Sequence, residues 1–335
     1  MTATALKATG SSDSLSPLES LTALHKALAD QLRLQILRLL KNESFGVLEL
    51  CRILDTRQSA LSHHLKILAT SHLVSTRREG NSIFYRRALL SGDDVHGDSK
   101  RAVFESLDAL EIPSAQRRKI KQIQLERAQL SLNFFNKNAS KFREKQGLIV
   151  EHADYASSLH DLITGLALDE ASAVMEVGPG EGQLLTELSQ RFKNLTALDN
   201  SKDMLERSRS AISDSGRSDV EFILGDTAVA RTQDVSSDLI IFDMVLHHIS
   251  SPAKTFKDIA ALLNPGGYLL IVELCSHDQD WVRESCGDLW LGFEEGDLDH
   301  WAEKAGLEKQ QSSYLGLRNG FQIQMRTFLN VASDA

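Results

Sequence analysis

The residues best suited to bind a ligand are a glycine-rich loop and an acidic side chain just before it. The loop Gly178-Pro179-Gly180-Glu181-Gly182 lets a ligand approach the backbone closely at the start of a helix. It is not a dinucleotide fingerprint, because Gln183 stands where the third glycine of that motif belongs. Glu176 would also repel a pyrophosphate. This spacing therefore favours a cationic or zwitterionic ligand, such as one with an ammonium and a sulfonium group.

Alternating strands and helices from residue 171 onward must position this loop, and they predict a parallel α/β sheet. The expected strands are residues 173–177, 195–199, 220–224, 238–243 and 268–273. Ligands of open α/β sheets bind beyond the carboxyl ends of the strands, where Glu176, Asp199, Asp226 and Asp243 fall. Asp199 suits ribose hydroxyls and Asp226 suits an adenine amine. The second half of the chain is thus predicted to be a doubly wound, Rossmann-like α/β domain.

The charge of the chain is divided unequally between its two ends. Residues 21–90 carry 11 Lys and Arg against 5 Asp and Glu, whereas residues 146–335 carry 14 against 31. A basic first third joined to an acidic remainder indicates that one end binds a polyanion and the other does not. A length of 335 residues also favours two domains, because it exceeds the size at which a single core usually stops growing.

The basic segment has the pattern of a helix-turn-helix followed by a hairpin. Apolar residues at helical spacing predict helices over residues 21–40, 47–54 and 58–69, with a tight turn between the last two. Two short strands around residues 79–82 follow. The predicted DNA-contacting residues lie on the outward face of the third helix and on the hairpin arm, and are Gln58, Ser59, Ser62, His63, Lys66, Arg77 and Arg78.

This segment resembles the ArsR-type winged-helix repressors. The resemblance lies in ADQLRLQIL at residues 29–37, QSALSHHLKIL at 58–68 and RREGNSIFYR at 77–86. It implies an α+β winged helix and a homodimer that reads a two-fold operator in double-stranded DNA. Members of this family that sense metals use paired thiols, but Cys51 is the one cysteine of the corresponding helix. No metal site is therefore predicted.

The second half of the chain resembles the class I S-adenosylmethionine-dependent methyltransferases, most clearly at residues 174–185, 197–204, 224–227 and 240–249. The resemblance implies S-adenosylmethionine as cofactor, or S-adenosylhomocysteine as effector. The loop and its acid would enclose the methionine part, and later residues would hold the ribose and the adenine. The predicted cofactor-binding residues are Glu176, Gly178, Gly180, Gly182, Asp199, Asn200, Met204, Asp226, Thr227 and Asp243.

No catalytic residue is assigned, because methyl transfer from a sulfonium depends on in-line positioning more than on side-chain chemistry. Weak candidates are His247, which follows the fourth expected strand, and His277 and Arg283, which follow the fifth. His247 is better interpreted as an architectural residue, whereas a pocket role and a surface-helix role for Arg283 are equally supported. Cys275 and Cys286 are too few thiols to favour arsenic as the methyl acceptor.

The expected organisation is a disordered N-terminus (1–16), a winged-helix domain (17–92), a helical connector that is either a dimer or a lid element (93–145), and a methyltransferase domain (146–335). The longest apolar runs have about five residues, which is too short to span a membrane. The N-terminus has no signal-peptide pattern. Because the three cysteines are also scattered, a cytoplasmic protein is expected.

Two functional hypotheses fit these features. In the first, the chain is a DNA-binding transcriptional regulator whose methyltransferase domain senses S-adenosylmethionine or S-adenosylhomocysteine, methylates a small metabolite, or does both. In the second, it is primarily a small-molecule methyltransferase with an autoregulatory DNA-binding module. Both require cofactor binding, and only turnover separates them, so the sequence leaves enzymatic activity open.

Overall fold

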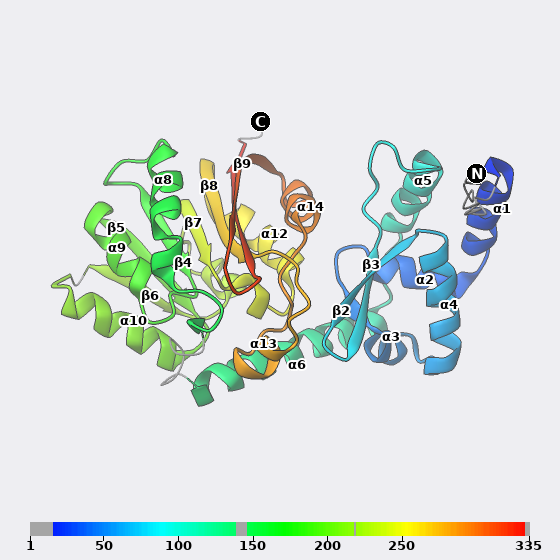
Figure 1. Ribbon diagram of the computed structural model, residues 1–335, viewed down its shortest axis with the longest axis horizontal. Helices are drawn as coiled ribbons and strands as arrows, with labels where there is room; N and C mark the ends of the chain where they lie inside the picture. The colour runs from blue at the N-terminus through cyan, green and yellow to red at the C-terminus, as the bar shows by residue number, and fades with distance from the viewer. Residues whose placement is uncertain (1–15, 139–145, 218, 332–335) are drawn as a thin grey trace, which may run out of the picture.

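The computed structural model describes residues 16–138, 146–217 and 219–331. It consists of two domains, an N-terminal helical one and one built around a seven-stranded sheet, and α6 (Ser114–Asn138) runs from one to the other (Figure 1). This two-domain arrangement and both fold classes confirm the sequence-based predictions. Among the residues just given, no helix is long and apolar enough to cross a membrane.

The N-terminal domain is a winged helix. Its helices are α1 (Pro17–Leu28), α2 (Gln31–Leu39), α3 (Val47–Leu54), α4 (Gln58–Thr70) and α5 (Gly97–Asp108). Three antiparallel strands, β1 (Phe45–Gly46), β2 (Val74–Glu79) and β3 (Ser82–Arg87), pair in the order β1-β3-β2. Leu61, Leu65 and Leu68 are buried on the inner face of α4, which leaves the opposite face of this helix in solvent.

The single helix predicted over residues 21–40 is in fact two helices. Asp30, between α1 and α2, has an extended backbone with φ −154° and ψ 127°. Its carboxylate accepts a hydrogen bond from the backbone N–H of Arg33 at 3.0 Å. Asp30 is therefore an N-cap that starts a new helix. The apolar spacing continues across the break because α1 and α2 face the same core.

The C-terminal domain places helices on both faces of a mixed sheet. Its strands are β4 (Ala173–Val177), β5 (Asn194–Asp199), β6 (Val220–Leu224), β7 (Ser237–Asp243), β8 (Leu263–Leu274), β9 (Leu307–Gly316) and β10 (Gln322–Asn330). Its helices are η2 (His152–Asp154), α8 (Ala156–Gly165), α9 (Gln183–Arg191), α10 (Lys202–Asp214), α11 (Thr227–Ala230), η3 (Leu246–His248), α12 (Pro252–Leu262), α13 (Trp281–Ser285) and α14 (Glu295–Ala305). The strands β4 to β8 are parallel as predicted, whereas β9 and β10 are antiparallel and were not predicted.

The order of the strands determines where a ligand can bind. The sheet runs β6-β5-β4-β7-β8-β10-β9, so the chain moves outward from β4 through β5 to β6 and then returns to β7 on the other side of β4. The topological switch point therefore lies between β4 and β7. Glu176 lies near the end of β4 and Asp243 ends β7, which puts both acids at this point.

The connector between the domains contains α5 and α6. The sequence suggested a bend around residues 136–138, and α6 ends at Asn138. Residues 139–145 of the connector lie outside the described residues, and so do residues 1–15, for which the sequence predicted disorder.

Candidate functional site

The glycine loop lies between the end of β4 and the start of α9. Gly178, Gly180 and Gly182 all have left-handed backbone conformations, with φ of 69°, 56° and 82°. A Cβ atom on Gly182 would lie 2.9 Å from the Cα atom of Ser208, so a larger residue does not fit there. The loop thus brings bare backbone to the switch point of the sheet.

Glu176 is buried beside this loop without a partner for one carboxylate oxygen. The residue is 2% exposed, and its Oε2 accepts no hydrogen bond from the described residues. Burial, and then the charge of Asp243, holds the pKa of Glu176 well above its usual range. An unpartnered buried carboxylate is costly, so a cationic ligand group at this position would be stabilising.

Asp243 is held by two side chains from the segment that precedes β4. The Tyr155 hydroxyl donates to Asp243 at 2.8 Å, and Nδ1 of His152 lies 3.4 Å from the same carboxylate. His152 also lies 3.0 Å from Glu187. Burial opposes protonation of His152, but the two acids outweigh it and raise its pKa to about 9. No local motif marks His152 and Tyr155, so their place beside Asp243 could not be predicted from the sequence.

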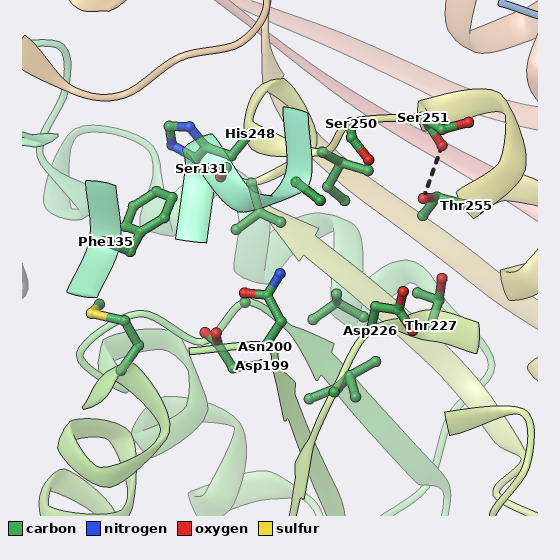
Figure 2. A pocket seen from close by; sticks show the side chains of 18 of the residues that line it. Ser131, Phe135, Asp199, Asn200, Asp226, Thr227, His248, Ser250, Ser251 and Thr255 are labelled. Atoms are coloured by element: carbon green, nitrogen blue, oxygen red, sulfur yellow. Dashed lines mark hydrogen bonds between the residues drawn. The ribbon is translucent and has the colours of Figure 1, made fainter. Parts of the chain in front are cut away.

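The acids at the ends of β5 and β6 lie farther along the same edge of the sheet. Burial raises the pKa of Asp199 to about 6. Asp226 caps α11 and accepts a hydrogen bond from the Val229 backbone N–H at 3.0 Å. Figure 2 shows Asp199 and Asn200 on one side of a cavity and Asp226 with Thr227 on the other.

Two adjoining cavities bring together all of the predicted cofactor-binding residues. The smaller cavity, of about 170 Å³, is lined by Gly178, Gly180, Asp199, Asn200, Met204, Asp226 and Thr227 among others. The larger, of about 510 Å³, is lined by Glu176, Gly178, Gly180, Gly182 and Asp243 among others. Both are bordered by Gly178, Gly180 and Val245. An elongated ligand could therefore extend from one cavity into the other across the glycine loop.

A separate surface on the N-terminal domain suits a polyanion. The residues predicted to read DNA from α4 are all exposed: Gln58, Ser59, Ser62, His63 and Lys66. α4 contains no acidic residue, and Arg57 stands directly before it. This face of α4 can therefore approach phosphates without electrostatic repulsion from its own side chains.

Two family models match the chain. One, described as a bacterial regulatory protein of the arsR family, matches residues 30–76. The other, described as a methyltransferase domain, matches residues 175–271. The chain joins an ArsR-type DNA-binding domain to a methyltransferase domain.

Each domain also has relatives among known proteins. The transcriptional activator HlyU of Vibrio cholerae is 47% identical over 62 residues, which cover 18% of this chain and 57% of that protein. The malonyl-[acyl-carrier protein] O-methyltransferase of a Marinomonas species is 27% identical over 192 residues, covering 56% of this chain and 69% of that protein. The chain spans only 3% to 4% of the polyketide synthase-nonribosomal peptide synthetases that it also matches.

Among solved structures, the methyltransferase domain matches the N-methyltransferase NodS of Bradyrhizobium japonicum WM9, which was solved with S-adenosyl-L-homocysteine. The two are 18% identical with a TM-score of 0.40, and the match covers 50% of this chain and 81% of that one.

The connector helix α6 covers the smaller cavity of the methyltransferase domain. Ala128, Ser131 and Phe135 of α6 line this cavity. The ring of Phe135 meets the ring of His248 edge to face, with centroids 4.7 Å apart (Figure 2). Of the two roles that the sequence left open for this helix, the position of these side chains favours the lid.

The weak catalytic candidate His247 is buried and faces neither of these cavities. Its Nδ1 lies 2.6 Å from Glu273 and its Nε2 lies 4.0 Å from Asp288. Burial lowers the pKa of His247, but the charges of these two acids outweigh it and raise the pKa to about 9.

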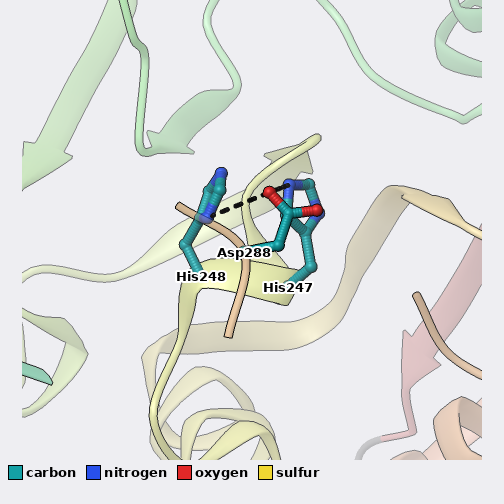
Figure 3. A group of neighbouring side chains, drawn as sticks. All are labelled: His247, His248 and Asp288. Atoms are coloured by element: carbon teal, nitrogen blue, oxygen red, sulfur yellow. Dashed lines mark ion pairs between the residues drawn. The ribbon is translucent and has the colours of Figure 1, made fainter. Parts of the chain in front are cut away.

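His247, His248 and Asp288 also offer potential metal-ligand atoms within 4.8 Å of one another (Figure 3). Because Nδ1 of His247 already pairs with Glu273, the group is explained by ion pairing within the protein, and the expected lack of a metal site stays a prediction.

The other two catalytic candidates also lie away from the cavities. His277 packs edge to face on Phe321, with ring centroids 4.8 Å apart. Arg283 donates to the Leu289 carbonyl at 2.8 Å and lies 3.5 Å from Glu79 of the winged helix. Neither lines the two cavities, so the geometry does not support an acceptor-pocket role for Arg283. The contact between the domains orients this side chain, and a single sequence does not reveal that contact.

The two wing arginines predicted to contact DNA have different surroundings. Arg78 is exposed. Arg77 instead turns toward the methyltransferase domain, donates to the Gly292 carbonyl at 2.9 Å, and lies over the rings of Trp290 and Phe293. In this arrangement Arg77 is not available to a phosphate, which departs from the expectation drawn from its place on the hairpin.

Proposed function

We propose that the chain is a transcriptional regulator that binds duplex DNA through α4 as a homodimer and senses S-adenosylmethionine or S-adenosylhomocysteine in its methyltransferase domain. The unpartnered carboxylate of Glu176 fits the ammonium group of the methionine part. Asp199 would accept hydrogen bonds from the ribose, and Asp226 with Thr227 would meet the adenine. When bound, S-adenosylmethionine would supply an activated methyl group and a positive charge.

The observation that carries this proposal is the position of Arg127 in the middle of α6. Its Nε and Nη2 donate to the Glu49 carboxylate of α3 at 2.9 and 2.5 Å. Its Nη1 lies 3.4 Å from the Ser250 carbonyl of the methyltransferase domain. One and two turns farther along, Ser131 and Phe135 line the cavity. A ligand in the cavity would therefore touch the same helix that holds the helix-turn-helix.

A ligand changes DNA binding only if its affinity differs between the DNA-bound and free forms. The two candidate ligands differ by one methyl group and one positive charge. The buried acid Glu176, with Asp243 close to it, provides an electrostatic basis for telling them apart.

The test is a titration of an operator, selected from random duplexes, with saturating S-adenosylmethionine, saturating S-adenosylhomocysteine or no ligand. Coupling of the usual size would separate the curves by roughly 5- to 150-fold in operator affinity. Gly180→Val is the control, because a side chain there fills the space that the ligand needs, and it should give one curve under all three conditions. Identical wild-type curves would reject the sensor function.

The second candidate function is methylation of a small or lipid-like metabolite, with the winged helix regulating the gene of the enzyme itself. This function is favoured by the size of the larger cavity, about 510 Å³, which offers room for a substrate beside the loop that carries Gly178, Gly180 and Gly182. A radiolabelled methyl-transfer assay against a metabolite extract separates the two functions. Labelled product supports the enzyme, whereas tight cofactor binding without product supports the sensor.

A further inference from the structure

The β2–β3 hairpin, residues 74–87, which we call the wing, docks on α13, on the start of α14 and on the segment between them in the methyltransferase domain (Figure 1). A Cβ atom on Gly80 at its tip would lie 3.3 Å from the side chain of Arg283. Glu79 is 1% exposed, accepts a hydrogen bond from the Leu291 backbone N–H at 2.7 Å, and lies 3.5 Å from Arg283. A charged end of the wing is therefore buried in the other domain.

Two arginines of the wing are held in the same contact. Arg86 forms an ion pair with Asp297 in the first turn of α14, and Arg77 lies 3.9 Å from the same carboxylate. The Arg77 guanidinium also lies 5.4 Å from the Trp290 ring centroid and 5.3 Å from that of Phe293. Asp297 is 4% exposed. Asp297 of the methyltransferase domain thus neutralises Arg86, whereas Arg77 also forms an ion pair with Glu79 of the wing itself.

The docked segment extends toward the cofactor cavity. The backbone N–H groups of Leu289 and Trp290 donate to the His247 carbonyl at 3.0 and 3.1 Å, and the adjacent His248 lines the cavity. Beside these contacts, a cavity of about 420 Å³ lies between the wing and the methyltransferase domain. The domains are therefore joined here by polar contacts and by an aromatic contact, between Phe84 of the wing and Trp290, next to open space.

We propose that the docked wing is an autoinhibitory latch, and that DNA binds most tightly to the form in which the wing is released. Contacts between arginine and phosphate set both the affinity for DNA and its dependence on salt. Arg86 can make such contacts only when Asp297 no longer neutralises it, and Arg77 only when it leaves the Gly292 carbonyl and the rings that it covers. Phosphates carry no sequence information, so DNA of any sequence would compete with the latch. The inference rests on the DNA-binding half of the proposed function alone.

The test variant is Asp297→Asn, which removes the charge that holds the wing. It keeps an oxygen for the Glu294 backbone N–H, from which Asp297 accepts a hydrogen bond at 3.2 Å as part of the helix cap. The matched control is Glu295→Gln, which removes the same charge from the same helix but from a pair with Lys309, at 3.0 Å, inside the methyltransferase domain. The DNA affinity of both variants and of the wild type is measured without nucleoside, by titration of a mixed-sequence duplex of about 30 base pairs. This length is enough for two half-sites one helical turn apart.

The latch predicts that Asp297→Asn binds the duplex roughly tenfold more tightly than the wild type. The slope of log K against log salt should steepen by about one unit for each arginine released to a phosphate, whereas Glu295→Gln should keep the wild-type slope. Adding Arg86→Gln to Asp297→Asn should reduce the gain. Unchanged or weaker binding by Asp297→Asn, or an equal gain in both single variants, would overturn the proposal.

A measurement on the wild type keeps the proposal testable if Asp297→Asn fails to fold. The Leu291 amide is tied to Glu79 of the wing, so its hydrogen exchange should accelerate when saturating duplex releases the latch. Unchanged protection of this amide in the DNA complex would contradict the latch. Neither experiment contains nucleoside, so failure of the latch is distinguishable from failure of ligand sensing.

Discussion

Asp199 and Glu176 are both carboxylates at the ends of strands, yet their surroundings prepare them for different ligand groups. Asp199 accepts a hydrogen bond from the Ser201 backbone N–H at 2.7 Å, which partly compensates its burial. Oε2 of Glu176 accepts no hydrogen bond from the part of the chain that the structure describes, and the pKa of Glu176 lies well above its usual range. A neutral ribose suits the first acid and a cation suits the second, in agreement with a zwitterionic nucleoside ligand.

We expect S-adenosylmethionine binding to weaken as pH falls through about 6, the pKa to which burial raises Asp199. Above this pH the carboxylate can accept from both ribose hydroxyls, and below it one oxygen is protonated. The dissociation constant, measured by calorimetry between pH about 5 and 8, should rise by up to about tenfold per pH unit below the pKa.

The control for this pH dependence is Asp199→Asn. It should bind weakly at every pH and lack the step that we assign to Asp199. A wild-type affinity that does not change across the range would show that Asp199 does not contact the ligand.

For single residues, the sequence predicted the position of those side chains whose place follows from backbone periodicity. Acids at the ends of parallel strands must gather at one edge of the sheet, so Glu176 and Asp243 could be placed together. Arg77 could not be placed correctly, because a period-2 strand gives the face on which a side chain lies but not which domain covers that face. The same holds for Arg283, whose partners come from the wing.

Among the helices and strands, α4 is the element whose role depends most directly on its two faces. Its leucines are buried on one side, and its polar residues are exposed on the other. We expect Ser62→Ala, His63→Ala and Lys66→Ala each to weaken operator binding without unfolding the domain. Lys66→Ala should also reduce the salt slope by about one unit, because it removes a phosphate contact.

The control for α4 is Lys202→Ala, which removes the same charge from an exposed lysine on α10 of the methyltransferase domain. Its salt slope, measured by operator titration, should match the wild type. Full operator affinity of the triple α4 variant would rule out this helix as the reading element.

Elements were predictable from the sequence where burial leaves a regular apolar pattern. The helices of the helix-turn-helix bury one face, and the parallel strands bury both faces against two cores and so form short apolar runs. The edge strand β9 does not, since Leu307 is buried and the residues after it are mostly exposed, so neither alternation nor an apolar run marks it. The apolar residues of α6 likewise face two different domains, which explains why its role stayed open.

In the whole molecule, the domains are connected through a small number of buried charges, and Arg127 is the most central. It is 7% exposed and lies over the rings of Phe45, Phe84 and Trp290. We expect Arg127→Met to lower the free energy of unfolding by about 3 kcal/mol, because it leaves the Glu49 carboxylate without its main partner. Urea unfolding followed by tryptophan fluorescence measures this loss.

Arg52→Met is the matched control for Arg127→Met. Arg52 also joins α3 to α6, through hydrogen bonds of 2.7 and 2.8 Å to Glu126, but this pair is half exposed. Exposed pairs contribute little to stability, so this variant should unfold close to the wild type. Equal destabilisation by both variants would mean that Arg127 does not join the domains.

The uninterrupted path of α6 gives the molecule a lever arm. The helix has 25 residues and contains neither glycine nor proline, so it is about 37 Å long and has no built-in hinge. A tilt of only about 5° at its cavity end would move its far end by about 3 Å over that length. That displacement is comparable to the length of a hydrogen bond to a base edge. A ligand that shifts Phe135 by a fraction of an ångström could therefore move the winged helix out of register with the groove, with no contact between the ligand and the DNA-binding domain.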